Sequence, residues 1–203
     1  MLDRFRSVAN RLLEPWVKLA LAVGATPDTI SVVAFLLAVG AGGTYVLAGA
    51  TPILYLAGAL LVFLNGWLDL LDGAVARRTD TASAAGDLLD HVLDRYADIV
   101  IIVGLAVGVE QYAIGLAAIT GVLMTSYLGT QAQAVGLDRV YGGLVGRADR
   151  LALVGLVTAV APFAPVELRG LSLVGLLLVF FAVVGHVTAL QRFYYSMRAL
   201  GAE

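Results

Sequence analysis

The chain has 203 residues, a formal net charge of −2 and a mean hydropathy of +0.91. Only 14% of its residues are charged, against about 25% in ordinary soluble domains, so the composition excludes a typical water-soluble protein and predicts an integral membrane protein. The absence of cysteine also excludes a disulfide framework and a thiolate metal site.

The first 25 residues mix charged side chains with apolar ones and lack the charged-then-apolar layout of a cleaved signal peptide. We predict that residues 1–25 form an amphipathic juxtamembrane helix on the membrane surface. A partly mobile tail is the alternative.

Six membrane-spanning helices should follow, because several apolar runs approach or exceed the roughly 20 residues that cross a bilayer. The first should have Thr26 as its cap, Pro27 at the first helical position and Asp28 near the positive end of the helix dipole. We expect the six helices at about 27–48, 52–77, 86–109, 112–135, 149–165 and 170–196. The predicted fold is an all-α integral membrane protein, with one domain over residues 1–203 and a six-helix core over 26–198.

The distribution of basic residues predicts the orientation. Three short turns, at 48–52, 108–112 and 162–170, should lie on one side of the membrane. Of the 13 Lys and Arg residues, only Arg169 falls on these turns. Because short cytoplasmic loops carry the Lys/Arg excess, we expect a multi-pass protein of the cytoplasmic membrane with both termini facing the cytoplasm.

Aspartates gather near the cytoplasmic ends of the second and third spans. Asp69 and Asp72 are three residues apart and Asp90 and Asp94 are four apart, so each pair shares a helix face. We expect the two helices to be antiparallel neighbours that bring the four carboxylates together. Such a cluster needs positive charge, and an all-oxygen ligand set favours two Mg²⁺ or Mn²⁺ ions, which suit phosphoryl chemistry. The active site would then face the cytoplasm.

Two other interpretations of the aspartates stay open at this point. They could form structural ion pairs with Arg77, Arg78 and Arg95, or they could be a divalent-cation transport site. Their position in the cytoplasmic half, with no matching polar path in the outer halves of the spans, disfavours transport. A metal-dependent enzyme is the favoured interpretation.

The segment also carries a longer pattern, Asp69-x-x-Asp72-Gly73-x-x-Ala76-Arg77, eight residues, then Gly86-x-x-x-Asp90-x-x-x-Asp94. It resembles the signature of the CDP-alcohol phosphotransferase family, also called CDP-alcohol phosphatidyltransferases, and the resemblance extends over nearly the whole chain. It implies a transferase of phospholipid biosynthesis that moves a phosphatidyl-type group from CDP-diacylglycerol or CDP-archaeol to a polar alcohol and releases CMP. It also implies a homodimer among membrane lipids, with no nucleic-acid partner.

The resemblance assigns roles to individual residues. Asp69, Asp72 and Asp90 would be metal ligands, and Asp94 would be both a metal-site carboxylate and the catalytic general base. The CDP-lipid would be bound by Asp28, Asp69, Gly73, Ala76, Arg77 and Gly86. Asp98, one turn beyond Asp94, lies outside the signature and could orient a ligand.

The acceptor alcohol depends on three arginines near the cytoplasmic ends of the last two spans, Arg147, Arg150 and Arg192. They resemble those of the phosphatidylinositol-phosphate synthase branch, including archaetidylinositol-phosphate synthases, which implies inositol phosphate as acceptor. This chain differs from that branch at one place: it has Gly129, Thr130 and Gln131 where the branch is expected to have lysine and arginine. Glycerol phosphate, free inositol and serine therefore stay open as acceptors, and ordinary positive charge at helix ends is the alternative for the arginines.

Overall fold

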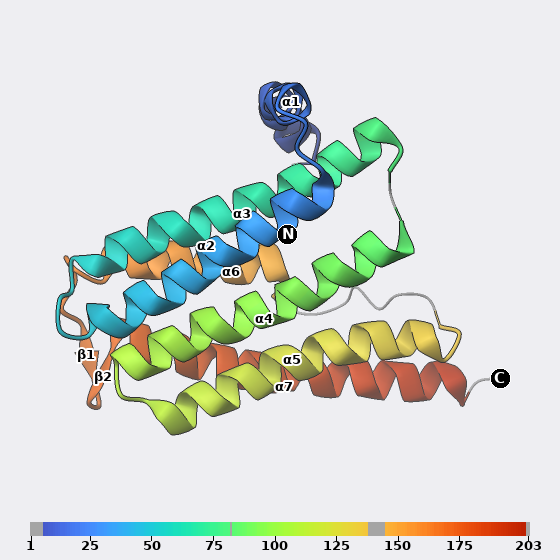
Figure 1. The fold of residues 1–203 in the computed structure, drawn as a ribbon. Helices are drawn as coiled ribbons and strands as arrows, with labels where there is room; N and C mark the ends of the chain where they lie inside the picture. The colour runs from blue at the N-terminus through green and yellow to red at the C-terminus, as the bar shows by residue number, and fades with distance from the viewer. Residues whose placement is uncertain (1–5, 82, 138–144, 202–203) are drawn as a thin grey trace.

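The computed structural model describes residues 6–81, 83–137 and 145–201, with the backbone alone for residues 6–11. Its helices are α1 (Arg6–Ala22), α2 (Pro27–Ala48), α3 (Leu54–Thr79), α4 (Ala84–Gly108), α5 (Tyr112–Ala134), α6 (Arg147–Val160) and α7 (Leu173–Leu200). A short antiparallel hairpin connects α6 to α7; its strands β1 (Glu167–Leu168) and β2 (Leu171–Ser172) have two residues each. Apart from this hairpin, which the sequence did not lead us to expect, the described chain is helical (Figure 1).

Four helices, α2, α3, α5 and α7, are long and apolar enough to cross a membrane. The helix α4 has 25 residues, but its N-terminal half carries the aspartates. The helix α6 has 14 residues and is thus only about 21 Å long, against a bilayer core of about 30 Å. It ends before the expected boundary at 165, because Pro162 and Pro165 cannot donate the hydrogen bonds that would continue it. The structure therefore supports a multi-pass all-helical membrane protein.

Local capping explains where the helices begin and end. The Thr26 side chain accepts a hydrogen bond from the Thr29 backbone N–H and Pro27 occupies the first turn, as predicted. Ser83 caps α4 in the same way through the Gly86 backbone N–H. Asp80 ends α3 in the left-handed conformation, with φ at 53°. These caps place the two aspartate-bearing helix ends on either side of one short connection.

The long helices lie side by side, and their connections gather at two opposite ends (Figure 1). One end holds the α2–α3 and α4–α5 turns and the β hairpin. The other holds the α3–α4 connection, the start of α6 and the end of α7, with α1 crossing the C-terminal half of α3. The turns are thus sorted between the two ends as the sequence predicts.

The helix α2 packs against both α3 and α4, while α3 and α4 make little close contact with each other. The expectation that α3 and α4 are direct neighbours is therefore wrong, although they do run antiparallel. Small residues on α2 allow this arrangement: a Cβ on Gly104 of α4 would collide with the backbone of Gly42. Gly121 of α5 meets Gly185 of α7 in the same manner. These glycines serve contacts within the chain, so they give no support to a dimer interface.

Candidate metal and nucleotide site

Three carboxylates converge in the space between α3 and α4. Asp69, Asp72 and Asp90 each offer one oxygen, and these oxygens all lie within 4.8 Å of one another. Asp72 is 6% exposed; its Oδ2 accepts a hydrogen bond of 2.6 Å from Ser31 Oγ on α2. Its Oδ1 accepts one of 2.5 Å from the Gly73 backbone N–H. Several like charges held this closely repel one another, so the arrangement calls for a cation among them.

Arg147, the first residue of α6, supplies positive charge at one side of this cluster. Its Nη1 donates to Asp69 Oδ1 at 2.5 Å, and its Nη2 lies 2.7 Å from Asp94 Oδ1. One guanidinium therefore bridges α3 and α4 by contacting Asp69 and Asp94 at once. The Asp94 Oδ2 atom also lies 3.5 Å from Nη2 of the adjacent Arg95.

The atoms around the cluster fit a hard divalent cation. A cavity of about 10 Å³ is lined by the four aspartates together with Ser31, Asn65 and Arg147. Asn65 is 1% exposed, and its Nδ2 donates to the Ala34 carbonyl of α2 at 2.9 Å. Its Oδ1 has no hydrogen-bond partner among the described residues. A buried amide oxygen without a partner is costly, and oxygen donors of this kind suit Mg²⁺ or Mn²⁺.

A second cavity, of about 230 Å³, opens next to the carboxylates. It is lined by the predicted CDP-lipid residues Asp28, Gly73, Ala76, Arg77 and Gly86, together with the metal-site residues Asp72 and Asp90 and with Ser31. Asp69 lines the smaller carboxylate cavity instead. The structure therefore gathers the predicted nucleotide-binding residues around one space beside the predicted metal ligands.

Two glycines that line this cavity lie close to other side chains of its lining. A Cβ at Gly86 would lie 3.2 Å from Asp28 Oδ1, and a Cβ at Gly73 would lie 3.2 Å from Arg77 Nη1. Side chains at these two positions would push into the cavity wall and reduce the space beside the carboxylates.

The three predicted acceptor arginines each engage a protein oxygen in this structure. Arg147 holds Asp69 and Asp94, as described. Arg150 is 7% exposed and its Nη2 donates to Asp98 Oδ2 at 2.7 Å. The Arg192 Nη1 donates to the Thr125 carbonyl of α5 at 2.7 Å. All three lie toward the end of the bundle that holds the α3–α4 connection, where Arg147 lines the carboxylate cavity and Arg150 lines a separate small cavity.

Three residues near the site were not assigned a part in it from the sequence, or only loosely. Ser31 holds Asp72, Asn65 faces the carboxylate cavity, and Asp98 holds Arg150. A signal existed for Asn65, because it is a polar residue in an apolar run and lies one helical turn before Asp69. Ser31 and Asp98 depend on partners in other helices, which spacing within one helix does not identify.

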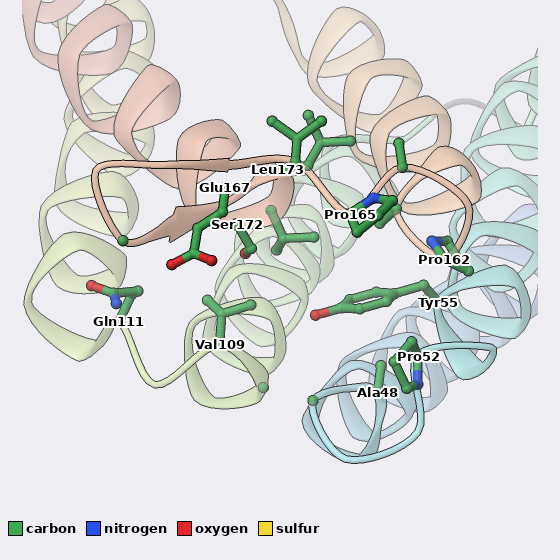
Figure 2. Close-up of a pocket in the computed structure, with 17 residues that line it drawn as sticks. Ala48, Pro52, Tyr55, Val109, Gln111, Pro162, Pro165, Glu167, Ser172 and Leu173 are labelled. Atoms are coloured by element: carbon green, nitrogen blue, oxygen red, sulfur yellow. The ribbon is translucent and has the colours of Figure 1, made fainter.

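A larger cavity, of about 490 Å³, lies at the opposite end of the molecule between the β hairpin and the α2–α3 and α4–α5 turns (Figure 2). The Tyr55 ring points into it from α3, and Gln111 and Glu167 line its far side. Glu167 is the one formally charged side chain among the described residues that line it. A single carboxylate cannot form the multi-ligand site that a divalent cation needs.

Comparison of the chain with known proteins identifies a matching family. The family model described as CDP-alcohol phosphatidyltransferase matches residues 24–188. The chain is 32% identical over 201 residues to the archaetidylinositol phosphate synthase of Methanothermobacter thermautotrophicus, which covers 98% of this chain and 96% of that protein. It is 29% identical over 230 residues to the phosphatidylinositol phosphate synthase of Cutibacterium acnes, covering 98% and 99%.

Solved structures of a phosphatidylinositol phosphate synthase have a fold similar to that of this chain. The phosphatidylinositol phosphate synthase of Mycobacterium tuberculosis with CDP-DAG bound superposes with a TM-score of 0.78 at 27% identity, covering 92% of this chain and 94% of that chain. The same enzyme in complex with manganese and citrate gives a TM-score of 0.78 at 26% identity, covering 91% and 88%.

Proposed function

Because the chain belongs to the CDP-alcohol phosphatidyltransferase family, we propose that it transfers the phosphatidyl-type group of a CDP-lipid to inositol phosphate and releases CMP. The observation that carries this proposal is the convergence of Asp69, Asp72 and Asp90 beside a cavity lined by the family's nucleotide-binding residues. Relatives that match almost the full chain are named as synthases of inositol-phosphate lipids in both archaea and bacteria. Their names support inositol phosphate as the acceptor.

The metal site in this proposal is built on Asp69, Asp72 and Asp90, with Asp94 joining for a second ion. The manganese complex of the Mycobacterium tuberculosis relative supports a divalent cation of this kind. When bound, the ions would neutralise the pyrophosphate and stabilise the negative charge that develops on the transferred phosphoryl group. Either Mg²⁺ or Mn²⁺ suits an all-oxygen ligand set.

The side chains of the nucleotide cavity hold the donor. Gly73, Ala76 and Gly86 leave room for the cytidine nucleotide to approach the backbone of α3 and α4, and Asp28 borders the same space. The Arg77 guanidinium can donate two parallel hydrogen bonds to phosphate oxygens. The lipid chains would then extend between the helices, toward the apolar part of the membrane.

The reaction forms one bond and breaks one bond at phosphorus. The acceptor hydroxyl attacks the phosphorus that carries the lipid, and the bond from this phosphorus to the oxygen of CMP breaks. The proton of the hydroxyl passes to an Asp94 oxygen, because an alcohol becomes a strong nucleophile only as it loses that proton. Arg147 contacts Asp94 in this structure, and its guanidinium would also suit the phosphate of an acceptor bound beside Asp94.

The acceptor pocket is proposed around Arg147, Arg150 and Arg192. Asp98 would hold Arg150 in place through their 2.7 Å contact, and the three arginines would hold the acceptor phosphate. Glycerol phosphate is the second candidate acceptor, because Gly129, Thr130 and Gln131 remove basic charge from the same end of α5. Ester and ether donors are both retained as candidates.

The finer membrane arrangement is part of the same proposal. The helices α4 and α6 complete six spans with the four that meet the length and hydropathy requirements. We place α1 on the cytoplasmic surface because it exposes Leu12, Trp16 and Leu19 next to the charged Glu14 and Lys18. We keep the remaining sequence predictions as part of this proposal. They are a single domain, cytoplasmic termini, a location in the cytoplasmic membrane and a homodimeric assembly.

The test is CMP release by the purified protein, with CDP-diacylglycerol and CDP-archaeol each offered in the presence of Mg²⁺ or Mn²⁺. Inositol phosphate, glycerol phosphate, free inositol and serine are compared as acceptors. We expect turnover with inositol phosphate and at least tenfold less with the unphosphorylated alcohols, since a lost charged hydrogen bond costs about 1.5–3 kcal/mol. Turnover with free inositol or serine alone would contradict the proposed acceptor-phosphate pocket. Metal flux into sealed vesicles without any CDP-lipid would contradict the proposed enzyme function.

A further inference from the structure

A groove of about 300 Å³ lies between the surface helix α1 and the cytoplasmic end of α3. It is lined by Glu14, Val17, Lys18, Leu21, Ala74, Arg77 and Arg78. Its volume is at the lower end of the range of small-molecule sites, about 300–1,000 Å³. Of these residues, only Arg77 has a part in the proposed transfer reaction.

The charges of the groove favour an anionic occupant. Lys18, Arg77 and Arg78 face one carboxylate, Glu14, and that carboxylate already lies 3.3 Å from Lys18 Nζ. Within the part of the chain that the structure describes, neither Arg77 nor Arg78 makes an ion pair. Two guanidinium groups on successive residues are therefore available to phosphate oxygens from one side of the groove.

The other wall of the groove favours a lipid over a soluble anion. Val17, Leu21 and Ala74 give it an apolar side. The helix α1 exposes Leu12 and Trp16 on its surface, which is the pattern of a helix that lies at the level of the headgroups. A ligand that combines a phosphate with apolar chains matches both walls. We propose that the groove between α1 and α3 binds the headgroup of an anionic membrane phospholipid, separately from the CDP-lipid.

This site has a direct connection to the nucleotide cavity. Arg77 lines both the groove and the 230 Å³ cavity beside the carboxylates. A phospholipid that draws the Arg77 guanidinium toward the groove changes the charge that faces the donor pyrophosphate. The groove is thus placed to make donor binding depend on the surrounding membrane.

The two tryptophans of the chain provide a local probe. Trp16 of α1 and Trp67 of α3 lie edge to face, with ring centroids 6.4 Å apart, at the junction of the two helices. The tryptophan fluorescence of the full-length protein therefore reports on this region alone. It can be quenched by phospholipids brominated in their acyl chains, and the mole fraction that gives half of the quenching measures the preference for a headgroup.

We expect brominated phosphatidylglycerol to quench at a mole fraction three- to tenfold lower, as an order-of-magnitude estimate, than brominated phosphatidylcholine, because each basic residue at the surface attracts anionic lipid. The double variant Lys18→Gln/Arg78→Gln should reduce this ratio to about one. The matched control is Arg198→Gln. It removes an exposed cation from the last turn of α7, outside the groove, and should leave the ratio of the two quenching mole fractions unchanged. Equal quenching by the two lipids in the unmodified protein, or an unchanged ratio in the double variant, would overturn the site.

Two further arms identify the source of the phosphate. Inorganic phosphate should not relieve the quenching, and CDP-diacylglycerol without metal should not displace the brominated phosphatidylglycerol; displacement by either would overturn a separate phospholipid site. Neither arm needs turnover, so failure here is distinguishable from failure of the transferase proposal. Circular dichroism of the double variant shows whether it has folded, and Lys18→Gln alone repeats the measurement if it has not.

Discussion

The two ends of the helix bundle differ in how they combine cavity volume with charge, and this difference supports the proposed site. The end with the β hairpin has the larger cavity, about 490 Å³, yet a single carboxylate lines it (Figure 2). The opposite end has a cavity of about 230 Å³ that adjoins three converging carboxylates. Ionised groups in a membrane protein are expensive, so a cluster of them persists where a ligand needs them. Charge that converges on one point, rather than cavity volume, marks the site.

Removal of the divalent metal is the change that should separate the two ends most. We expect CMP release to fall by about 10³-fold or more on chelation, because the metal supplies several kcal/mol of charge stabilisation, and to return with Mg²⁺ or Mn²⁺. The helices should stay folded, since Arg147 provides counter-charge to Asp69 and Asp94. CMP release and circular dichroism of the same samples measure both effects, and full turnover in chelator would exclude a metal-dependent reaction.

Replacement of the proposed general base, Asp94, should have the next largest effect. Asp94→Asn keeps the size of the side chain but cannot accept the proton, so turnover should fall by about 10²–10⁴-fold. Binding of CDP-lipid, measured by equilibrium titration, should persist.

Asp80→Asn is the matched control, because Asp80 ends α3 in a left-handed conformation that asparagine also adopts. This control should keep its turnover. An Asp94→Asn protein with normal turnover would place the base elsewhere.

Loss of the Ser31 hydroxyl should have a smaller effect that is specific to the metal. Ser31→Ala removes the 2.6 Å hydrogen bond to Asp72 and should weaken Mn²⁺ binding by about 10–100-fold, as expected for a group that orients a ligand. Electron paramagnetic resonance of free Mn²⁺ measures the affinity. Thr44→Ala is the control, because that hydroxyl bonds to the Gly40 carbonyl of the same helix. Equal Mn²⁺ affinities in the two variants would deny Ser31 a part in the site.

Changes at the hairpin end should have the smallest effect. Glu167→Gln removes the charge that lines the larger cavity, and turnover should stay within about twofold of the unmodified protein, as is usual for surface substitutions. CMP release under saturating substrates is the measurement. A tenfold loss would show that the two ends are coupled and would weaken the contrast between them.

Much of this site could be predicted from the sequence because its information is local. The spacing of Asp69 with Asp72 and of Asp90 with Asp94 defines a helix face in each case, whatever the rest of the chain does. The caps at Thr26 and Ser83 likewise depend on backbone groups three residues away.

The errors concern contacts between distant segments. The helices α3 and α4 were expected to be neighbours, but α2 packs between them and leaves space where the carboxylates meet. One local error was the predicted helix end at 165: α6 ends at Val160, because Pro162 and Pro165 cannot continue it, and this could have been inferred from the sequence.

By itself, the sequence determined that this is a helical membrane protein with a carboxylate pattern typical of its family, because hydropathy and spacing act over a few turns of helix. Only the tertiary structure decided that Arg147, 78 residues beyond Asp69, bridges two of the carboxylates, and that Ser31 and Asn65 join the site. It also created the groove between α1 and α3. Such contacts depend on how the helices pack in three dimensions, and packing is set by side-chain shape across the whole chain rather than by any one segment.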